Sequence, residues 1–230
     1  MSTRIVKYAK SDQVAKLIIA SGNVAWSEAS SFTFTSGWKS PVYVNMRGVL
    51  AAPHFRRELI GHACTFLRST LDLEEIDVIA GGETAGIPYA ALIADGLEKE
   101  FSYVRKAQKG FGLERLIEGA DVRNKKVLLV EDLTTDGRSK LSFADSIRRA
   151  GGEISDIFSC FYYGLRDVTV ELLGPARLSL GVLCEWSDIL DCPESASILS
   201  IDQKKSLLQF LADPPRWTSE NRDIRSGTSA

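Results

Sequence analysis

The sequence has few residues of the kinds that bind transition metals. Its 230 residues include four cysteines and two histidines. The cysteines form no Cys-x-x-Cys pair and the spacing of His54 and His62 fits no metal motif, so a zinc or redox site is not expected. We expect the cysteines to be reduced and mostly buried. Gly-x-Ser-x-Gly, Walker and Gly-x-Gly-x-x-Gly motifs are also missing, which argues against hydrolases, P-loop proteins and dinucleotide-binding proteins.

Long apolar runs and strong charge are missing as well. No apolar run approaches the roughly 18 residues needed to span a membrane. Segment 1–7 carries charge but no apolar signal-peptide core, so we expect a cytoplasmic protein without a membrane partner. The net charge of −2 and the pI of about 5.8 give no support for a nucleic-acid partner.

Length and composition favour one α/β domain. With 44% hydrophobic residues, the chain can bury one sizeable core. Apolar segments alternate with helical patterns, which is typical of a parallel, doubly wound sheet. The predicted strands are 76–80, 102–104, 127–130 and 154–163, with a further one at 178–183. We predict a single domain over residues 1–212, in which residues 1–50 contribute a small hood, followed by a polar, flexible C-terminal tail at 213–230.

Other patterns predict the elements around this sheet. Apolar spacing predicts helices at 12–21, 53–69 and 200–211. Alternation within 32–47 predicts a β-hairpin that turns at Ser36-Gly37, and Pro41 limits its second strand to an edge position. Segment 105–119 combines cations and glycines with little apolar periodicity, which predicts a mobile loop.

The segment from Val127 to Ser139 carries the clearest functional pattern. An unbroken apolar run predicts a strand buried on both faces, and a helical pattern follows the segment. We therefore predict that Glu131, Asp132 and the hydroxyl residues after them lie on the loop between strand and helix. A helix N-terminus binds phosphate, whereas carboxylates accept hydrogen bonds from sugar hydroxyls or hold Mg²⁺ through its outer shell. A ribose phosphate satisfies both halves of this loop.

A second glycine-rich loop follows the predicted strand at 76–80. Gly81, Gly82 and Gly86 permit positive φ angles and exposed N–H groups, which together form a cradle for an anion. A helical pattern follows this loop as well. For both loops, the alternative interpretation is an ordinary turn between a strand and a helix.

Four segments in this chain resemble motifs of the type I phosphoribosyltransferases. Segment 127–139 resembles their motif for phosphoribosyl diphosphate (PRPP), and Gly81-Gly-Glu-Thr-Ala-Gly-Ile-Pro88 resembles their diphosphate loop. Ser36-Gly-Trp-Lys-Ser-Pro-Val-Tyr43 and Arg105-Lys-Ala-Gln-Lys-Gly-Phe-Gly112 resemble two signatures of the orotate phosphoribosyltransferases. The resemblance covers residues 30–165, in the family's order and spacing. It implies a central parallel sheet flanked by helices, with a small N-terminal hood subdomain.

This resemblance implies a reaction and a set of roles. The 5-phosphoribosyl group passes from PRPP to orotate with Mg²⁺, giving orotidine 5′-monophosphate and diphosphate in de novo pyrimidine biosynthesis. Lys109, Glu131 and Asp132 are the implied catalytic residues, and the two acids hold ribose hydroxyls near a Mg²⁺ ion that has no direct protein ligand. Tyr43, Lys39 and Thr135 are the implied orotate contacts. The implied PRPP ligands are Arg105, Lys106, Lys109, Glu131, Asp132, Leu133, Thr134, Thr135, Asp136, Gly137, Arg138 and Ser139, and the diphosphate loop adds Gly82, Glu83, Thr84, Ala85 and Gly86. The family also implies a homodimer in which the 105–119 loop reaches the neighbouring site.

Several positions depart from the family pattern. Phe111 replaces a histidine, and losing one donor to the leaving group costs on the order of a hundredfold in rate. Asp136 replaces a small uncharged residue beside the phosphate, and Arg138 is an equally unusual cation. Thr35 occupies the place of a substrate-binding lysine, and Arg166 comes later than the family's orotate-binding arginine. Two alternatives therefore stay open: a salvage phosphoribosyltransferase for another nucleobase, or a weakly catalytic PRPP-binding regulator.

Overall fold

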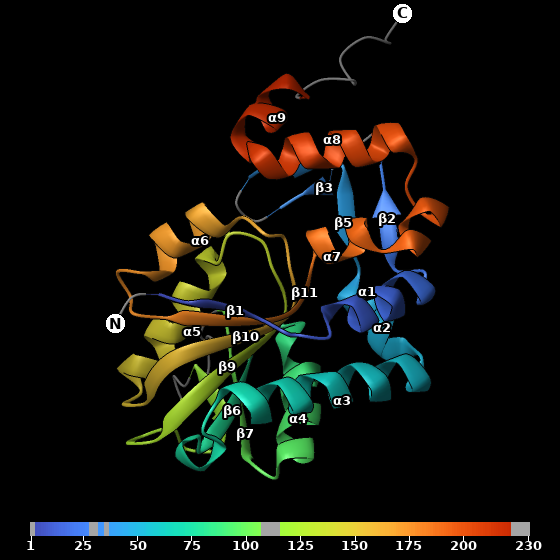
Figure 1. The fold of residues 1–230 in the computed structure, drawn as a ribbon. Coiled ribbons are helices and arrows are strands. Elements are labelled where there is room, and N and C mark those ends of the chain that lie inside the picture. Colours follow the sequence, from blue (N-terminus) through green and yellow to red (C-terminus); the bar gives the residue numbers. More distant parts are fainter. Residues whose placement is uncertain (1–2, 28–31, 35–36, 107–115, 222–230) are drawn as a thin grey trace, which may run out of the picture.

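The protein is built around one mostly parallel sheet, and the computed structural model describes residues 3–27, 32–34, 37–106 and 116–221. The strands of the sheet are β1 (Ile5–Lys7), β6 (Val78–Gly82), β7 (Glu100–Val104), β8 (Ile117–Gly119), β9 (Lys126–Thr134), β10 (Glu153–Tyr162) and β11 (Ser179–Glu185). They lie in the order β1-β11-β10-β9-β6-β7-β8 (Figure 1). Neighbouring strands run parallel except β7 and β8, which are antiparallel.

Helices cover both faces of the sheet, so the predicted doubly wound architecture is confirmed. The helices on one face are α1 (Ser11–Ala20), α3 (Pro53–Thr70) and α4 (Gly86–Leu97), and those on the other are α5 (Arg138–Arg149) and α6 (Arg166–Leu173). Side chains alternate along β9: Leu128 and Val130 pack toward the first group of helices, and Val127 and Leu129 toward the second. Burial on both faces explains the unbroken apolar run of this strand.

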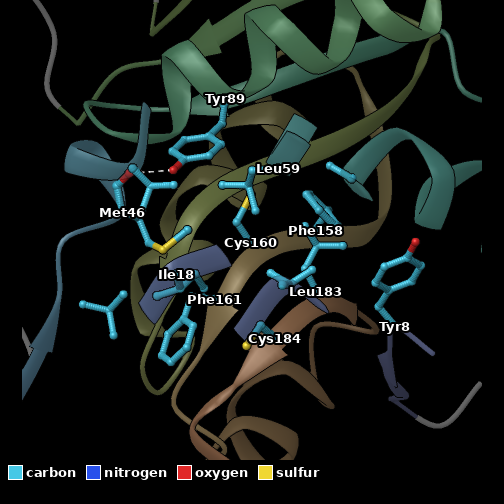
Figure 2. Packing of buried hydrophobic residues seen from close by; sticks show 14 of the residues in the cluster. Tyr8, Ile18, Met46, Leu59, Tyr89, Phe158, Cys160, Phe161, Leu183 and Cys184 are labelled. Carbon is cyan, nitrogen blue, oxygen red and sulfur yellow. Dashed lines mark hydrogen bonds between the residues drawn. The ribbon is translucent and has the colours of Figure 1, made fainter. Parts of the chain in front are cut away.

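The apolar residues that recur at helical spacing in α3 are buried in the core on this side of the sheet. Pro53 opens α3, where its missing N–H is not needed, and Leu59 and Ala63 recur on one face and are fully buried. Figure 2 shows Leu59 and Tyr89 within this core. The hydroxyl of Tyr89 donates a 2.7 Å hydrogen bond to the carbonyl of Met46. The short helical segments are α2 (Met46–Ala51), α7 (Trp186–Asp191), η1 (Leu73–Glu75) and η2 (Pro193–Ser197).

Two small antiparallel ribbons form the hood. β3 (Phe32–Thr33) pairs with β4 (Lys39–Ser40), which confirms the predicted hairpin. The second predicted strand is divided, however, because β4 ends before Pro41. Beyond that proline, β5 (Val42–Val44) pairs instead with β2 (Val24–Trp26). The hairpin turn at 35–36 lies outside the described residues.

The C-terminal part of the chain covers the hood. Figure 1 shows α8 (Ile201–Ala212) and α9 (Pro214–Glu220) above the hood ribbons, away from the central sheet. The prediction of a flexible tail from residue 213 is therefore wrong for α9, in which Trp217 and Thr218 are buried. A capping bond from the N–H of Arg216 to Asp213 starts this helix. The rest of the predicted tail, 222–230, lies outside the described residues.

Two edge strands correct the predicted boundaries. β1 pairs with β11, so residues 5–7 belong to the central sheet and not to the hood. β8 lies within the predicted loop at 105–119 and pairs with β7. Within the described ranges, no helix is long and apolar enough to cross a membrane.

Candidate active site

The two predicted loops meet at one edge of the central sheet. β6 and β9 are neighbouring parallel strands, with Gly81 opposite Val130. The glycine-rich loop after β6 and the segment after β9 therefore leave the sheet side by side. Ligands of open α/β sheets bind at this edge, beyond the carboxyl ends of the strands.

The acid pair lies on a strand and not, as predicted, on a loop. β9 continues to Thr134 because β10 extends beside it, with Ser159 opposite Glu131. Successive side chains of a strand point to opposite faces. Glu131 and Asp132 therefore point in opposite directions.

Glu131 points toward the α5 side of the sheet and is buried. Its Oε2 atom lies 3.0 Å from Nζ of Lys140, which is also buried. A Cβ atom on Gly82 would lie 1.7 Å from Oε1 of Glu131, so only glycine leaves room for this carboxylate. Burial raises the pKa of Glu131, and the charge of Lys140 opposes this shift.

Asp132 is half-buried and points to the other face of the sheet. Tyr89 of α4 and Cys160 of β10 belong to the core on that face. Burial raises the pKa of Asp132, while the positive charges of Lys140 and Arg47 oppose this shift. Burial also raises the pKa of the Cys160 thiol, and the charge of Asp132 adds to that effect. Asp132 is thus the acid of this pair that keeps partial exposure at the sheet edge.

The hydroxyl residues of the turn between β9 and α5 differ in exposure. Thr134 is fully buried and donates a 3.0 Å hydrogen bond to Ser159 within the sheet. Thr135 is half-buried, and Ser139 is exposed in the first turn of α5. Gly137 has a φ of 94°, a left-handed conformation that suits glycine.

Asp136 is buried and turns toward the start of α5. Its Oδ1 atom accepts a 3.0 Å hydrogen bond from the N–H of Arg138, and its Oδ2 atom lies 3.6 Å from Nε of Arg138. The two unusual residues of this motif are therefore paired with each other. The pairing offsets the negative charge that Asp136 brings to a predicted phosphate site.

The glycine-rich loop after β6 is connected to the chain beyond β7. A cis peptide bond joins Glu83 to Thr84. Oε2 of Glu83 accepts a 2.7 Å hydrogen bond from the N–H of Lys106. The loop predicted to bind diphosphate therefore lies next to Lys106, one of the lysines predicted to bind PRPP. Ala85 and Gly86 lead directly into α4.

The predicted basic loop starts and ends on paired strands. The N–H of Arg105 donates a 2.8 Å hydrogen bond to the carbonyl of Leu116, and the Arg105 guanidinium lies 3.5 Å from Glu118. Lys109 and Phe111 lie outside the described residues.

Two of the three predicted orotate contacts lie on the hood. Tyr43 is half-buried on β5, and its ring centroid lies 5.6 Å from that of Phe32. Lys39 is on β4, and its N–H donates a 3.1 Å hydrogen bond to the hydroxyl of Thr218 on α9. The third predicted contact, Thr135, is on the turn after β9. Thr35 lies outside the described residues.

Arg166 is engaged elsewhere in the structure. Its guanidinium lies 2.9 and 3.0 Å from the two carboxylate oxygens of Glu185, at the end of β11. Lys7 also lies 3.3 Å from Glu185. This contact fixes the start of α6 against β11.

Two cations near the acid pair were missed from the sequence. Lys140 is three residues before Phe143 on the buried face of α5, and this helical spacing was a usable signal. Arg47 is the second residue of α2, which follows the strand that carries Tyr43, but no local pattern links it to Asp132. Among the described residues, no group of three or more His, Cys, Asp or Glu side chains is placed to hold a metal ion.

Comparison with known proteins agrees with this arrangement. The phosphoribosyl transferase domain family matches residues 54–168. An orotate phosphoribosyltransferase from Ruegeria sp. (strain TM1040) is 38% identical over 208 residues, which cover 90% of this chain and 92% of the relative. Among solved structures, the fold is similar to that of Leishmania donovani UMP synthase (TM-score 0.76, 22% identity), covering 89% of this chain and 43% of that one. It is also similar to orotate phosphoribosyltransferase from Aeropyrum pernix (TM-score 0.64, 26% identity), covering 77% of this chain and 96% of that one.

Proposed function

Since this chain belongs to the orotate phosphoribosyltransferase family, we propose that it transfers the 5-phosphoribosyl group of PRPP to N1 of orotate. The bond between ribose C1 and the diphosphate oxygen breaks, and a bond between C1 and N1 forms. The products are orotidine 5′-monophosphate and diphosphate, a step of de novo pyrimidine synthesis. The observation that carries the proposal is the meeting of the glycine-rich loop and the segment after β9 beside Asp132, at the carboxyl ends of β6 and β9.

Asp132 binds the ribose hydroxyls in this proposal. Its carboxylate is half-buried at the sheet edge and accepts hydrogen bonds when ionised. The N–H groups at the start of α5, with the hydroxyls of Thr135 and Ser139, bind the 5-phosphate. Positive charge builds on the ribose as the diphosphate leaves, so catalysis depends on positioning and on stabilisation of the leaving group.

Diphosphate binds between the glycine-rich loop and the basic loop. The segment from Gly82 to Gly86 supplies the backbone, with Thr84 exposed in it, and the N–H of Lys106 at the start of the basic loop donates a hydrogen bond to Glu83 beside it. Arg105, Lys106 and Lys109 neutralise the leaving charge. The family to which the chain belongs supports a homodimer in which the 105–119 loop reaches the neighbouring subunit's site.

Mg²⁺ completes the proposed site. Mg²⁺ binds oxygen ligands and is often held by one or two carboxylates together with substrate phosphates and water. The ion would have no direct protein ligand: PRPP would supply oxygens that bind it, and the Asp132 carboxylate would accept hydrogen bonds from water bound to the ion. When bound, the ion neutralises charge on the diphosphate.

The hood binds the base. Tyr43 is half-buried on β5 and offers an aromatic face for a flat pyrimidine, and Lys39 offers a cation for its carboxylate. We place the reaction in the cytoplasm, which the four unpaired, buried cysteines support.

The test is orotate consumption by the purified protein with PRPP and Mg²⁺, followed by absorbance. We expect orotate to disappear, and chelation of Mg²⁺ to stop the reaction. Turnover of uracil or a purine in place of orotate would identify a salvage enzyme. PRPP binding without diphosphate release from any base would identify a regulator.

A further inference from the structure

Lys140 is buried in the first turn of α5, inside the segment predicted to bind PRPP. Its Nζ atom lies 3.0 Å from Oε2 of Glu131, 2.8 Å from the carbonyl oxygen of Leu133 and 3.2 Å from Oγ of Ser139. Only 5% of Lys140 is exposed. A buried ammonium group needs partners of this kind, and all three of these partners belong to residues 131–139.

The contacts of Lys140 connect the two ends of one loop. Leu133 lies at the end of β9, and Ser139 lies in the first turn of α5. One ammonium group therefore bridges the point where the strand ends and the point where the helix begins. The N–H of Lys140 also donates a 3.0 Å hydrogen bond to the carbonyl of Gly137, in the middle of the turn.

Glu131 extends this connection to the second loop. Its Oε2 atom pairs with Lys140, while its Oε1 atom occupies the space where Gly82 and Gly86 lack a side chain. The side chain thus packs between the diphosphate loop and the turn after β9. Asp132 faces the opposite side of the strand.

We propose that Lys140 is a positioning residue that holds the PRPP-binding segment in shape, and that Glu131 is its buried counter-ion rather than a ligand of the ribose hydroxyls. This proposal rests on the proposed function, since it assigns roles within the same site. It divides the acid pair, which the family resemblance treats as one unit. Asp132 contacts the substrate, and Glu131 with Lys140 supports the backbone that binds the phosphates.

The pairing also sets the charge of the site. Without Lys140, Glu131 and Asp136 would place two buried carboxylates close to a phosphate. Lys140 neutralises the first, and the neighbouring Arg138 offsets the second. The ammonium group thus favours both the loop shape and the binding of an anion.

Lys140→Met removes the charge and keeps much of the side-chain length. We expect the KM for PRPP to rise about tenfold or more, because a misplaced binding loop weakens uniform binding, while the KM for orotate changes less than about threefold. Glu131→Gln should have a smaller effect than Lys140→Met. The double variant should bind PRPP better than Lys140→Met alone, because it no longer buries an unpaired carboxylate.

Lys126→Met is the matched control. Lys126 pairs with Glu75 at 2.7 Å, at the opposite end of β9, and this pair is exposed. The control should leave both KM values unchanged. Lys140→Arg keeps the charge and should retain more PRPP affinity than Lys140→Met, which separates charge from folding.

PRPP-induced thermal stabilisation, measured without orotate, reports this proposal independently of the base. We expect the stabilisation to be much smaller for Lys140→Met than for the wild type or for Lys126→Met. If the wild type does not consume orotate but is stabilised by PRPP, the orotate assignment is rejected. The effect of Lys140 on PRPP binding can then still be measured. The proposal is overturned if Lys140→Met binds PRPP like the wild type, or if Glu131→Gln loses as much turnover as Asp132→Asn. If Lys140→Met does not fold, a Lys140→Arg variant that binds PRPP normally supports the need for a positive charge at this position. If folded Lys140→Arg and Lys126→Met lose PRPP affinity equally, the proposal is overturned.

Discussion

Two regions of the molecule are built in different ways: the edge of the sheet that carries the loops 81–86 and 131–139, and the hood formed by β2 to β5. At the edge, each functional loop follows its own strand, and neighbouring strands bring the loops together. In the hood, β2 and β5 pair across a gap in sequence, and α9 packs on β4 from the far end of the chain. Each loop of the edge is thus marked by the sequence around it, although the β6–β9 pairing that joins the loops is long-range; the hood is assembled from short strands and from α9 at the far end of the chain. We expect PRPP binding to depend on the edge and orotate binding on the hood.

The largest expected effect is at the edge, from Asp132→Asn. The change keeps the size of the side chain but removes its negative charge. In our proposal this carboxylate accepts hydrogen bonds from the ribose hydroxyls. We expect kcat/KM to fall on the order of a hundredfold or more. Steady-state rates measure this loss, with Asp145→Asn on the exposed side of α5 as the control. A fall of less than about threefold would remove Asp132 from the site.

Mixing two inactive variants tests whether the edge is completed by a second subunit. Asp132→Asn and Lys109→Ala each damage a different part of one site. If the basic loop crosses between subunits, a mixed dimer regains one intact site, and an equal mixture should recover about a quarter of wild-type activity. Rates are measured after subunit exchange and compared with each variant alone. No recovery in a mixture that does exchange subunits would place the loop in its own subunit's site.

Phe111→His tests whether the basic loop stabilises the leaving diphosphate. A histidine restores a donor to the diphosphate, so kcat should rise up to about tenfold while the KM for orotate stays constant. Phe111→Leu is the control for loss of the ring. If histidine brings no gain and Lys109→Ala is also harmless, the basic loop has no part in the reaction.

Thr218→Val tests the hood with the smallest expected effect. Its hydroxyl accepts from the N–H of Lys39, and loss of one such bond should raise the KM for orotate roughly three- to tenfold. The KM for PRPP should not change. Ser219→Ala, on the same helix, is the matched control. An equal rise in both KM values would mean that α9 supports the whole domain and not the base site.

The edge was largely predictable from sequence because its signals are local. Apolar runs located β6 and β9, and glycines and acids marked the loops after them. The length of β9 was missed because its polar end, Glu131 and Asp132, is held extended by pairing with β10, which no local pattern shows. The partner of Glu131 was missed for another reason: the spacing of Lys140 to Phe143 places it on the buried face of α5, but that spacing does not show which acid it contacts.

The hood was less predictable because its strands are short and pair over distance. β2 has only three residues, and nothing within 24–26 indicates β5 as its partner. α9 begins with two prolines in a polar stretch, which favours a loose tail. The structure orders it through Asp213 at its start and through Trp217, whose ring centroid lies 5.7 Å from that of Phe210.

The most direct test of the division between edge and hood is a grid of initial rates over both substrates, for Ser139→Ala and Tyr43→Ala. Ser139 is exposed at the start of α5, and Tyr43 is half-buried on β5. The account predicts a raised KM for PRPP alone in the first variant and a raised KM for orotate alone in the second. Equal increases in both constants for both variants would contradict it, because one region would then bind both substrates.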